Sequence, residues 1–154
     1  MLNIVYLIIG DSFELDITPT DNSDKMRYVT HKRTTKVYSI NSDRDIAYEV
    51  GYGIADASTY SPRISVYPAY VKDCTTPLEL TKNKNLYVLL VQKCTEKDIQ
   101  TVYYAVFVDK NNAIKEGEKM MKKLKKYNDS NLHYSVEEVR YYAPKIYSYD
   151  DFDL

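Results

Sequence analysis

The feature that most constrains the fold is an approximate internal duplication, because apolar runs and helical patterns follow one another in the same order twice along the 154 residues. In the first half, the apolar and β-branched runs predict strands at residues 2–9, 28–40 and 63–71, with a helix at 43–57. In the second half, they predict strands at residues 86–92, 101–108 and 134–142, with a helix at 112–127. Each half has the order strand, strand, helix, strand. We therefore expect an α+β fold in which two ββαβ halves form a pseudo-repeat.

Small residues recur at matching places in the two predicted helices. Ala47 and Gly51 are four residues apart in the first helix, as Ala113 and Gly117 are in the second. Residues four apart lie on one helical face, and small side chains there let a helix approach a sheet closely. We expect both helices to pack on antiparallel or mixed sheets, although a chance likeness between two ordinary halves stays open. Both final strands also contain a Ser-Val pair, at 65–66 and 135–136.

The chain divides into four segments by composition. We expect a first ββαβ half at residues 1–71, a linker at 72–85, a second half at 86–144 and an acidic aromatic tail at 145–154. The length suits one domain built from both halves, or two very small domains. Pro68 removes a backbone donor from the third strand, so that strand should lie at a sheet edge or contain a bulge. The apolar runs 2–9, 86–91 and 102–108 predict strands that are central or buried on both faces.

Polar residues mark where the predicted helices begin. Ser42 or Asn41 is expected to cap the first helix, and Asp109 or Asn111 the second. The second helix ends in lysines, whose positive charge favours the negative end of the helix dipole.

One short motif raises the question of catalysis. Gly10-Asp11-Ser12 follows an apolar strand and resembles the start of the GDSL, or SGNH, hydrolases, in which the motif serine is the nucleophile. That family also carries a C-terminal Asp-x-x-His, but here Asp129 and His133 are separated by three residues rather than two. Its glycine and asparagine blocks have no counterpart. We therefore expect a strand end and a turn at 10–12, and we predict that the protein is not an enzyme.

The sequence offers little for a metal ion or a cofactor. His31 and His133 stand in unrelated contexts, and Cys74 and Cys94 have no CxxC partner, which favours two buried free thiols. No nucleotide-binding or zinc motif occurs, so no cofactor is expected. A group of acidic residues lacks regular ligand spacing and is expected to form a solvated loop: Asp11, Glu14, Asp16, Asp21 and Asp24.

The apolar start of the chain bears on its compartment. Residues 2–9 are too few for a membrane span, and no basic residue or cleavage site accompanies them as in a signal peptide. We expect a cytoplasmic protein of a bacterial host with no membrane contact.

Charge and tyrosine content point to binding. The chain has 21 basic and 22 acidic side chains, a balance that excludes a binder driven only by surplus positive charge. Its 17 tyrosines supply amphipathic area suited to protein interfaces. We therefore expect a protein-binding factor, and a homodimer through the Pro68 strand or a tyrosine-rich face is also open. The candidate partner contacts are Tyr141, Tyr142, Lys122, Lys126, Asp151 and Phe152.

A nucleic-acid partner is the alternative. The predicted second helix is rich in lysine, and a basic stretch runs through residues 25–36. Lysines that meet phosphates, with tyrosines that stack on bases, would form a surface for RNA or single-stranded DNA.

The second half resembles small orphan proteins of bacteriophages and mobile elements. The resemblance is carried by Val106-Phe107-x5-Ala113, the lysine-rich helix, and the closing Tyr134-x-Val136-Glu137-Glu138-Val139. It covers about a third of the chain and contains no catalytic residue. It implies a host-takeover or anti-defence factor, such as an anti-CRISPR inhibitor, that occupies a surface of a host protein or ribonucleoprotein complex. The duplicated order and the acidic tail depart from that pattern, so the partner itself does not carry over.

Overall fold

The computed structural model describes residues 3–18, 28–57, 63–74, 76, 80, 82–94, 99–125 and 131–143. The predicted order of strands and helices is observed, and the mixed α+β class is confirmed. The first half contains β1 (Ile4–Thr18), β2 (Tyr28–Asn41), α1 (Arg44–Ala57) and β3 (Arg63–Tyr70). The second half contains β4 (Asn85–Cys94), β5 (Ile99–Phe107), α3 (Lys110–Lys125) and β6 (Leu132–Tyr142).

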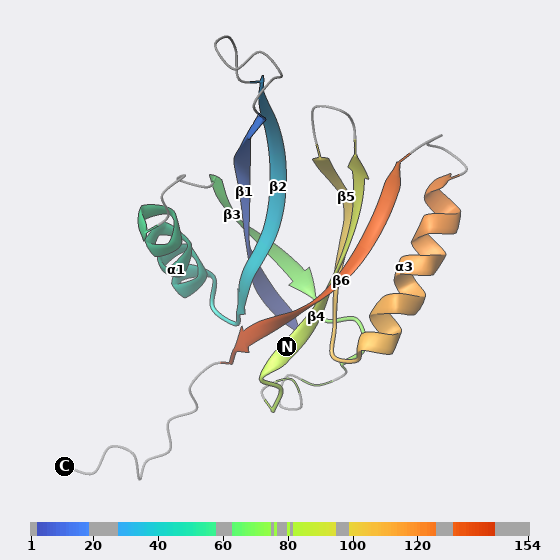
Figure 1. The fold of residues 1–154 in the computed structure, drawn as a ribbon. Coiled ribbons are helices and arrows are strands. Elements are labelled where there is room, and N and C mark those ends of the chain that lie inside the picture. The colour runs from blue at the N-terminus through green and yellow to red at the C-terminus, as the bar shows by residue number, and fades with distance from the viewer. Residues whose placement is uncertain are drawn as a thin grey trace, which may run out of the picture.

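The strands form one six-stranded mixed sheet in the order β3-β1-β2-β6-β4-β5. Within each half the third strand lies beside the first, the first lies beside the second, and both pairings are antiparallel. The halves join where β2 and β6 run parallel, through the Cα partners Ile40–Tyr141 and Asn41–Tyr142. From this junction the two groups of strands diverge, with α1 and α3 on their outer sides (Figure 1).

Two clusters of buried side chains stabilise this arrangement. The first joins the inner faces of the two halves, and it includes Leu7, Ile40, Leu90 and Val106. The second joins α3 to the outer face of β4 and β5 through residues such as Leu89, Phe107 and Ala113. The two edge strands of the sheet also approach each other, since Val71, which follows β3, forms an isolated parallel bridge with Val106 of β5.

The edge position predicted from Pro68 is confirmed, because β3 is an outer strand of the sheet. The expectation for residues 102–108 is only partly right. β5 is the opposite edge strand, so Val102 is exposed and burial is confined to the end of the strand at Ala105, Val106 and Phe107.

The first hairpin is longer than predicted. β1 and β2 pair from Tyr6–Asn41 as far as Thr18–Tyr28, so residues 10–12 continue a strand and do not form a turn. The expected solvated acidic loop is therefore wrong for Asp11, Glu14 and Asp16, which lie within β1. Asp21 and Asp24 lie outside the described residues.

Aspartates hold the starts of both helices. In α1 the Asp43 carboxylate accepts hydrogen bonds from the amides of Asp45 (2.8 Å) and Ile46 (3.1 Å), so Asp43 is the cap and not Ser42 or Asn41. The predicted Asp109 cap of α3 is confirmed by a 2.8 Å bond from the Asn111 amide.

Asp73, in the expected linker, adds a second carboxylate at the start of α3. It accepts hydrogen bonds from the Val108 amide (2.6 Å), the Asp109 amide (2.9 Å) and the Asn112 side chain (2.9 Å). The Lys72 amide donates to the carbonyl of Val106. Residues 72 and 73 are therefore fixed to the second half.

The close helix packing predicted from the Ala-x-x-x-Gly motifs is confirmed. Ala47, Gly51, Ala113 and Gly117 are the buried residues of the two helices. A Cβ atom built on Gly51 would lie 2.8 Å from Ile64 Cγ2, and one built on Gly117 would lie 2.6 Å from the ring of Tyr134.

Candidate functional site

Exposed apolar side chains gather on α1. Four of the eight large hydrophobic residues that are exposed in the described part of the chain belong to this helix: Ile46, Tyr48, Val50 and Tyr52. None of the eight belongs to α3, whose Met120, Met121 and Leu124 pack against the second cluster. An apolar surface that stays in water is unfavourable, and such surfaces often mark binding sites.

A groove of about 860 Å³ lies between α1 and β2, and we call it the α1–β2 groove. Ile46, Val50 and Ile54 form its helical wall, because residues four apart share one helical face. The strand wall is Tyr38, Ser39 and Asn41, and the end near the start of α1 is formed by Ser42, Asp43, Tyr142 and Ala143. The exposed fractions of Ile46, Val50 and Tyr142 are 49%, 38% and 50%.

The groove exists because of where α1 packs. Gly51 brings the helix onto Ile64 of β3 and Ile8 of β1, toward the β3 edge of the first half. The outer side of β2 therefore stays open beside the helix. β6 ends at the start of α1, where the Ser42 amide donates to the carbonyl of Tyr142 (3.1 Å), as the chain path in Figure 1 shows.

Basic side chains border this apolar floor. Lys36 Nζ lies 5.0 Å from the ring centre of Tyr38, and Arg140 Cζ lies 5.8 Å from that of Tyr142. The Asp43 carboxylate in the lining already bonds to two helix amides. The groove thus combines aliphatic and aromatic anchoring area with positive charge at its border, which suits an apolar segment that carries acidic residues.

One polar group in the groove wall is unsatisfied. Ser39 is only 6% exposed, and its Oγ has no hydrogen-bond partner among the residues that the structure describes. A buried hydroxyl without a partner costs roughly 1–3 kcal/mol. An occupant with a donor or acceptor at this depth would recover part of that cost.

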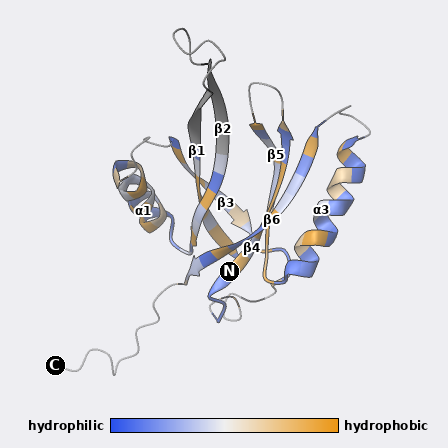
Figure 2. Cartoon of the chain, viewed as in Figure 1, coloured by the Kyte–Doolittle hydropathy of each residue, from blue (hydrophilic) through white to orange (hydrophobic). Residues whose placement is uncertain are grey.

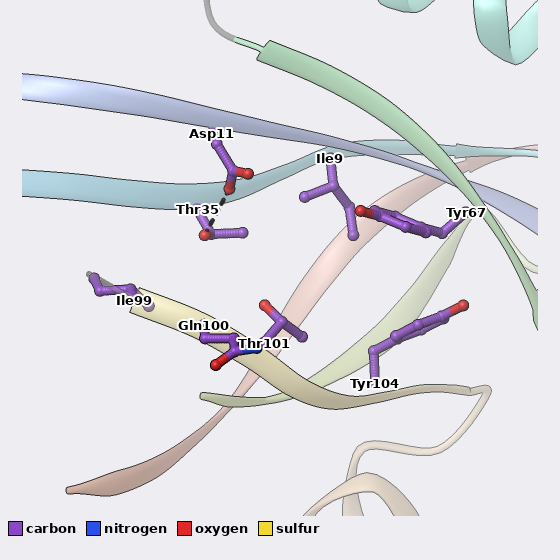
Figure 3. Close-up of a pocket in the computed structure, with 8 residues that line it drawn as sticks. All are labelled: Ile9, Asp11, Thr35, Tyr67, Ile99, Gln100, Thr101 and Tyr104. Carbon is purple, nitrogen blue, oxygen red and sulfur yellow. Dashed lines mark hydrogen bonds between the residues drawn. The ribbon is translucent and has the colours of Figure 1, made fainter. Parts of the chain in front are cut away.

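A second, smaller pocket of about 250 Å³ lies between the two halves (Figure 3). Thr35 on β2 donates a 2.9 Å hydrogen bond to Asp11 on β1, facing residues 99–101 of β5. Tyr67 of β3 and Tyr104 of β5 also line this pocket, and their ring centres are 5.7 Å apart. The Tyr104 hydroxyl donates a 3.0 Å hydrogen bond to the carbonyl of Pro68. These contacts fasten β3 to β5, which favours a structural role for this pocket.

Hydrophilic residues predominate along α3, with hydrophobic stretches between them (Figure 2). Its exposed lysines are Lys110, Lys115, Lys119, Lys122, Lys123 and Lys125. On the side facing β5, Lys72 forms an ion pair with Glu116 (3.5 Å) and a hydrogen bond with the Tyr103 hydroxyl. Burial lowers the pKa of Lys72, but Tyr103 and Glu116 outweigh it and raise that pKa overall. A raised pKa keeps this amine protonated at neutral pH, so Lys72 contributes a positive charge between Tyr103 and Glu116.

The predicted contact residues differ in their placement. Tyr142 is half exposed in the α1–β2 groove, and Lys122 is exposed on α3. Tyr141 does not lie on the surface as a partner contact would. It is only 4% exposed and packs in the cluster between the halves, where burial raises its pKa. Lys126, Asp151 and Phe152 lie outside the described residues.

Several other expectations concern possible chemistry. Ser12 is within β1 with Thr34 as its Cα partner, so it does not follow a strand end as a GDSL nucleophile would. Cys74 and Cys94 are free thiols, but both are half-buried and not buried as expected. In the described part of the chain, no group of three or more His, Cys, Asp or Glu residues could hold a metal ion. No helix there is long and apolar enough to cross a membrane.

The chain matches no protein-family model, and searches of characterised proteins and of solved structures find no significant match.

Proposed function

We propose that this protein is a non-enzymatic binding factor that attaches to another protein through the α1–β2 groove. The observation that carries the proposal is the apolar row of exposed Ile46, exposed Val50 and half-buried Ile54 beside the half-exposed ring of Tyr142. A tyrosine and aliphatic side chains in one concave surface are the composition of interface anchors. The basic border would orient a partner segment with acidic residues.

The biological setting is part of the same proposal. The resemblance of residues 86–142 to phage and mobile-element proteins supports a cytoplasmic factor that inhibits or redirects a host macromolecule. Its sharpest form is an anti-CRISPR inhibitor of a Cas effector. Binding through a surface requires no catalytic residues, so the proposal does not depend on the Gly10-Asp11-Ser12 motif.

We also propose that the two halves are a pseudo-repeat. Both halves have the same strand order, and equivalent residues occupy equivalent places: Ile8 is paired with Val66 in the first half and Leu89 with Val136 in the second. Asp43 and Asp109 cap helices whose Ala-x-x-x-Gly motifs lie at the same distance from the cap. On this interpretation, the α1–β2 groove is where the two halves have diverged.

An affinity capture from a bacterial lysate that contains CRISPR effectors tests the function. The tagged full chain should retain a stoichiometric protein after nuclease treatment, and Val50→Lys should lose it because a charge enters the groove. Tyr52→Lys is the matched control, since Tyr52 is on the same helix, is 66% exposed and does not line the groove. Equal capture by all three proteins would refute a role for the groove.

The alternative proposal is binding of RNA or single-stranded DNA through α3, favoured by its exposed lysines. A phosphate-led complex must weaken steeply as salt rises, with a slope set by the number of phosphates neutralised. Lys122→Glu together with Lys126→Glu should then reduce both the affinity and the salt slope in a filter-binding titration. Binding that survives this double change would exclude the α3 surface.

A further inference from the structure

We propose that the α1–β2 groove is a docking site for the chain's own C-terminal segment, residues 144–154. This inference goes beyond the proposed function. The docking is independent of any partner, and only its consequence, that a partner must displace the segment, rests on the proposed function. The inference comes from the position, the reach and the chemistry of these residues relative to the groove.

Position is the first argument. Ala143 and Tyr142 line the end of the groove, and residue 144 continues directly from Ala143. Residues 144–154 lie outside the described residues. A segment joined to the rim of a site is present there at an effective concentration of about 1 mM, so even a weak contact can be largely occupied.

Reach is the second argument. The helical wall from Ile46 to Ile54 covers eight rises of 1.5 Å along the α-helix, or about 12 Å. Eleven extended residues span about 36 Å. The segment can therefore cross the whole groove with residues to spare, in either an extended or a more compact form.

Chemistry is the third argument. The segment contains three aspartates and one lysine, and its apolar residues are Ile146, Tyr147, Tyr149, Phe152 and Leu154. The groove presents the aliphatic row of α1 and the Tyr142 ring as anchoring area. At its border, Arg140 and Lys36, which also lies near the Glu137 carboxylate, offer positive charge to the aspartates. The unpartnered Ser39 hydroxyl in the strand wall can receive a hydrogen bond from the segment's backbone or side chains.

The full chain itself allows a direct test, because it contains no tryptophan. Phe152→Trp places a single fluorophore in the segment, and Tyr149→Trp is a second probe in case residue 152 tolerates no larger ring. We expect a blue-shifted emission and reduced iodide quenching relative to the synthetic peptide 144–154 with the same tryptophan. Adding Val50→Lys should restore the emission and quenching of the peptide, whereas adding Tyr52→Lys should not.

Each other outcome overturns the inference. A tryptophan at both positions that is as exposed as in the peptide means that the segment does not dock. Protection that persists with Val50→Lys places it elsewhere, and protection that grows with protein concentration means that a second copy supplies it. Circular dichroism confirms that the variants fold. The test involves no partner, so its failure leaves the capture experiment unaffected, and failure of that experiment leaves this one interpretable.

Discussion

Two glycine substitutions measure how closely the helices pack. Gly53 and Gly117 are both inside helices and neither has a positive φ, so alanine fits the backbone at each position. In a helix interior, alanine is favoured over glycine by about 0.5–1 kcal/mol. An added Cβ at Gly53 meets no atom within 4 Å, so Gly53→Ala should gain that amount in the free energy of unfolding.

Gly117→Ala should have the opposite sign. Its Cβ would lie 2.6 Å from Cδ2 of Tyr134, 2.9 Å from Cε2 of Tyr134 and 3.0 Å from Cδ1 of Leu89. These two Tyr134 atoms belong to a rigid aromatic ring, so either the whole ring or the helix must shift to make room for the added Cβ. Overpacking of this kind costs about 1–3 kcal/mol. After the gain in helix propensity, we expect a net loss of about 1–2 kcal/mol.

Urea denaturation and thermal melting measure both changes. For a chain of this length, 1 kcal/mol corresponds to about 2–4 °C in melting temperature, so the two variants should move to opposite sides of the wild type. Tyr134→Val removes the ring and should make Gly117→Ala less costly in the double mutant. If Gly117→Ala stabilises the protein as Gly53→Ala does, α3 does not pack on β6 as described.

Three further predictions concern charged side chains. Asp73→Ala removes three hydrogen bonds at the start of α3 and should cost about 2–3 kcal/mol in urea denaturation; a loss no larger than that of the exposed control Asp56→Ala would contradict this role. Burial raises the pKa of Glu137, with partial opposition from Lys36, so the folded state binds more protons and stability falls as pH rises through that range. Glu137→Gln should therefore be more stable than the wild type at pH 7, and this advantage should vanish well below the ordinary carboxyl pKa of about 4.3; pH-dependent melting curves give the difference. The pKa of Lys72 is raised, so its contribution is present at neutral pH and is lost as pH rises through the lysine range above about 10.4. Lys72→Met should lower the melting temperature at pH 8, and a deficit that does not shrink in strong alkali would argue against the ionic contribution.

The order of the elements was predictable because each element has a strong local signal. The length of the first hairpin was missed, although residues 12–18 alternate strictly between polar and apolar types. That alternation predicts a strand, but the acidic residues favoured a loop. The register pairs residues 12–18 of β1 with residues 28–34 of β2, and this pairing depends on residues that are far apart in sequence.

The sequence did not predict the groove, because two neighbouring rows of apolar residues on α1 both have the spacing of a buried helix face. Ala47 and Gly51 form one row, and Ile46, Val50 and Ile54 form the neighbouring one. The larger side chains would be expected inside by hydrophobicity alone. Only the close approach of the small row to the sheet leaves Ile46 and Val50 exposed and Ile54 half-buried, and that approach depends on the tertiary position of the helix.

Strand register explains the mixed outcome for the tyrosines. Tyr141 and Tyr142 are adjacent, so their side chains must point to opposite faces of β6. The sequence alone does not indicate which of the two rings faces the core. The pairing of β6 with β2 and β4 buries Tyr141 and leaves Tyr142 in the groove.

Site-specific photo-cross-linking in bacterial cells tests the central claim, that the α1–β2 groove binds a protein, most directly. A benzophenone amino acid replaces Val50 in the groove or, as a control, Tyr70, which is 59% exposed on β3 and outside the groove lining. We predict a covalent adduct with another protein from position 50 and none from position 70. Adducts from position 70 without any from position 50 would contradict the account.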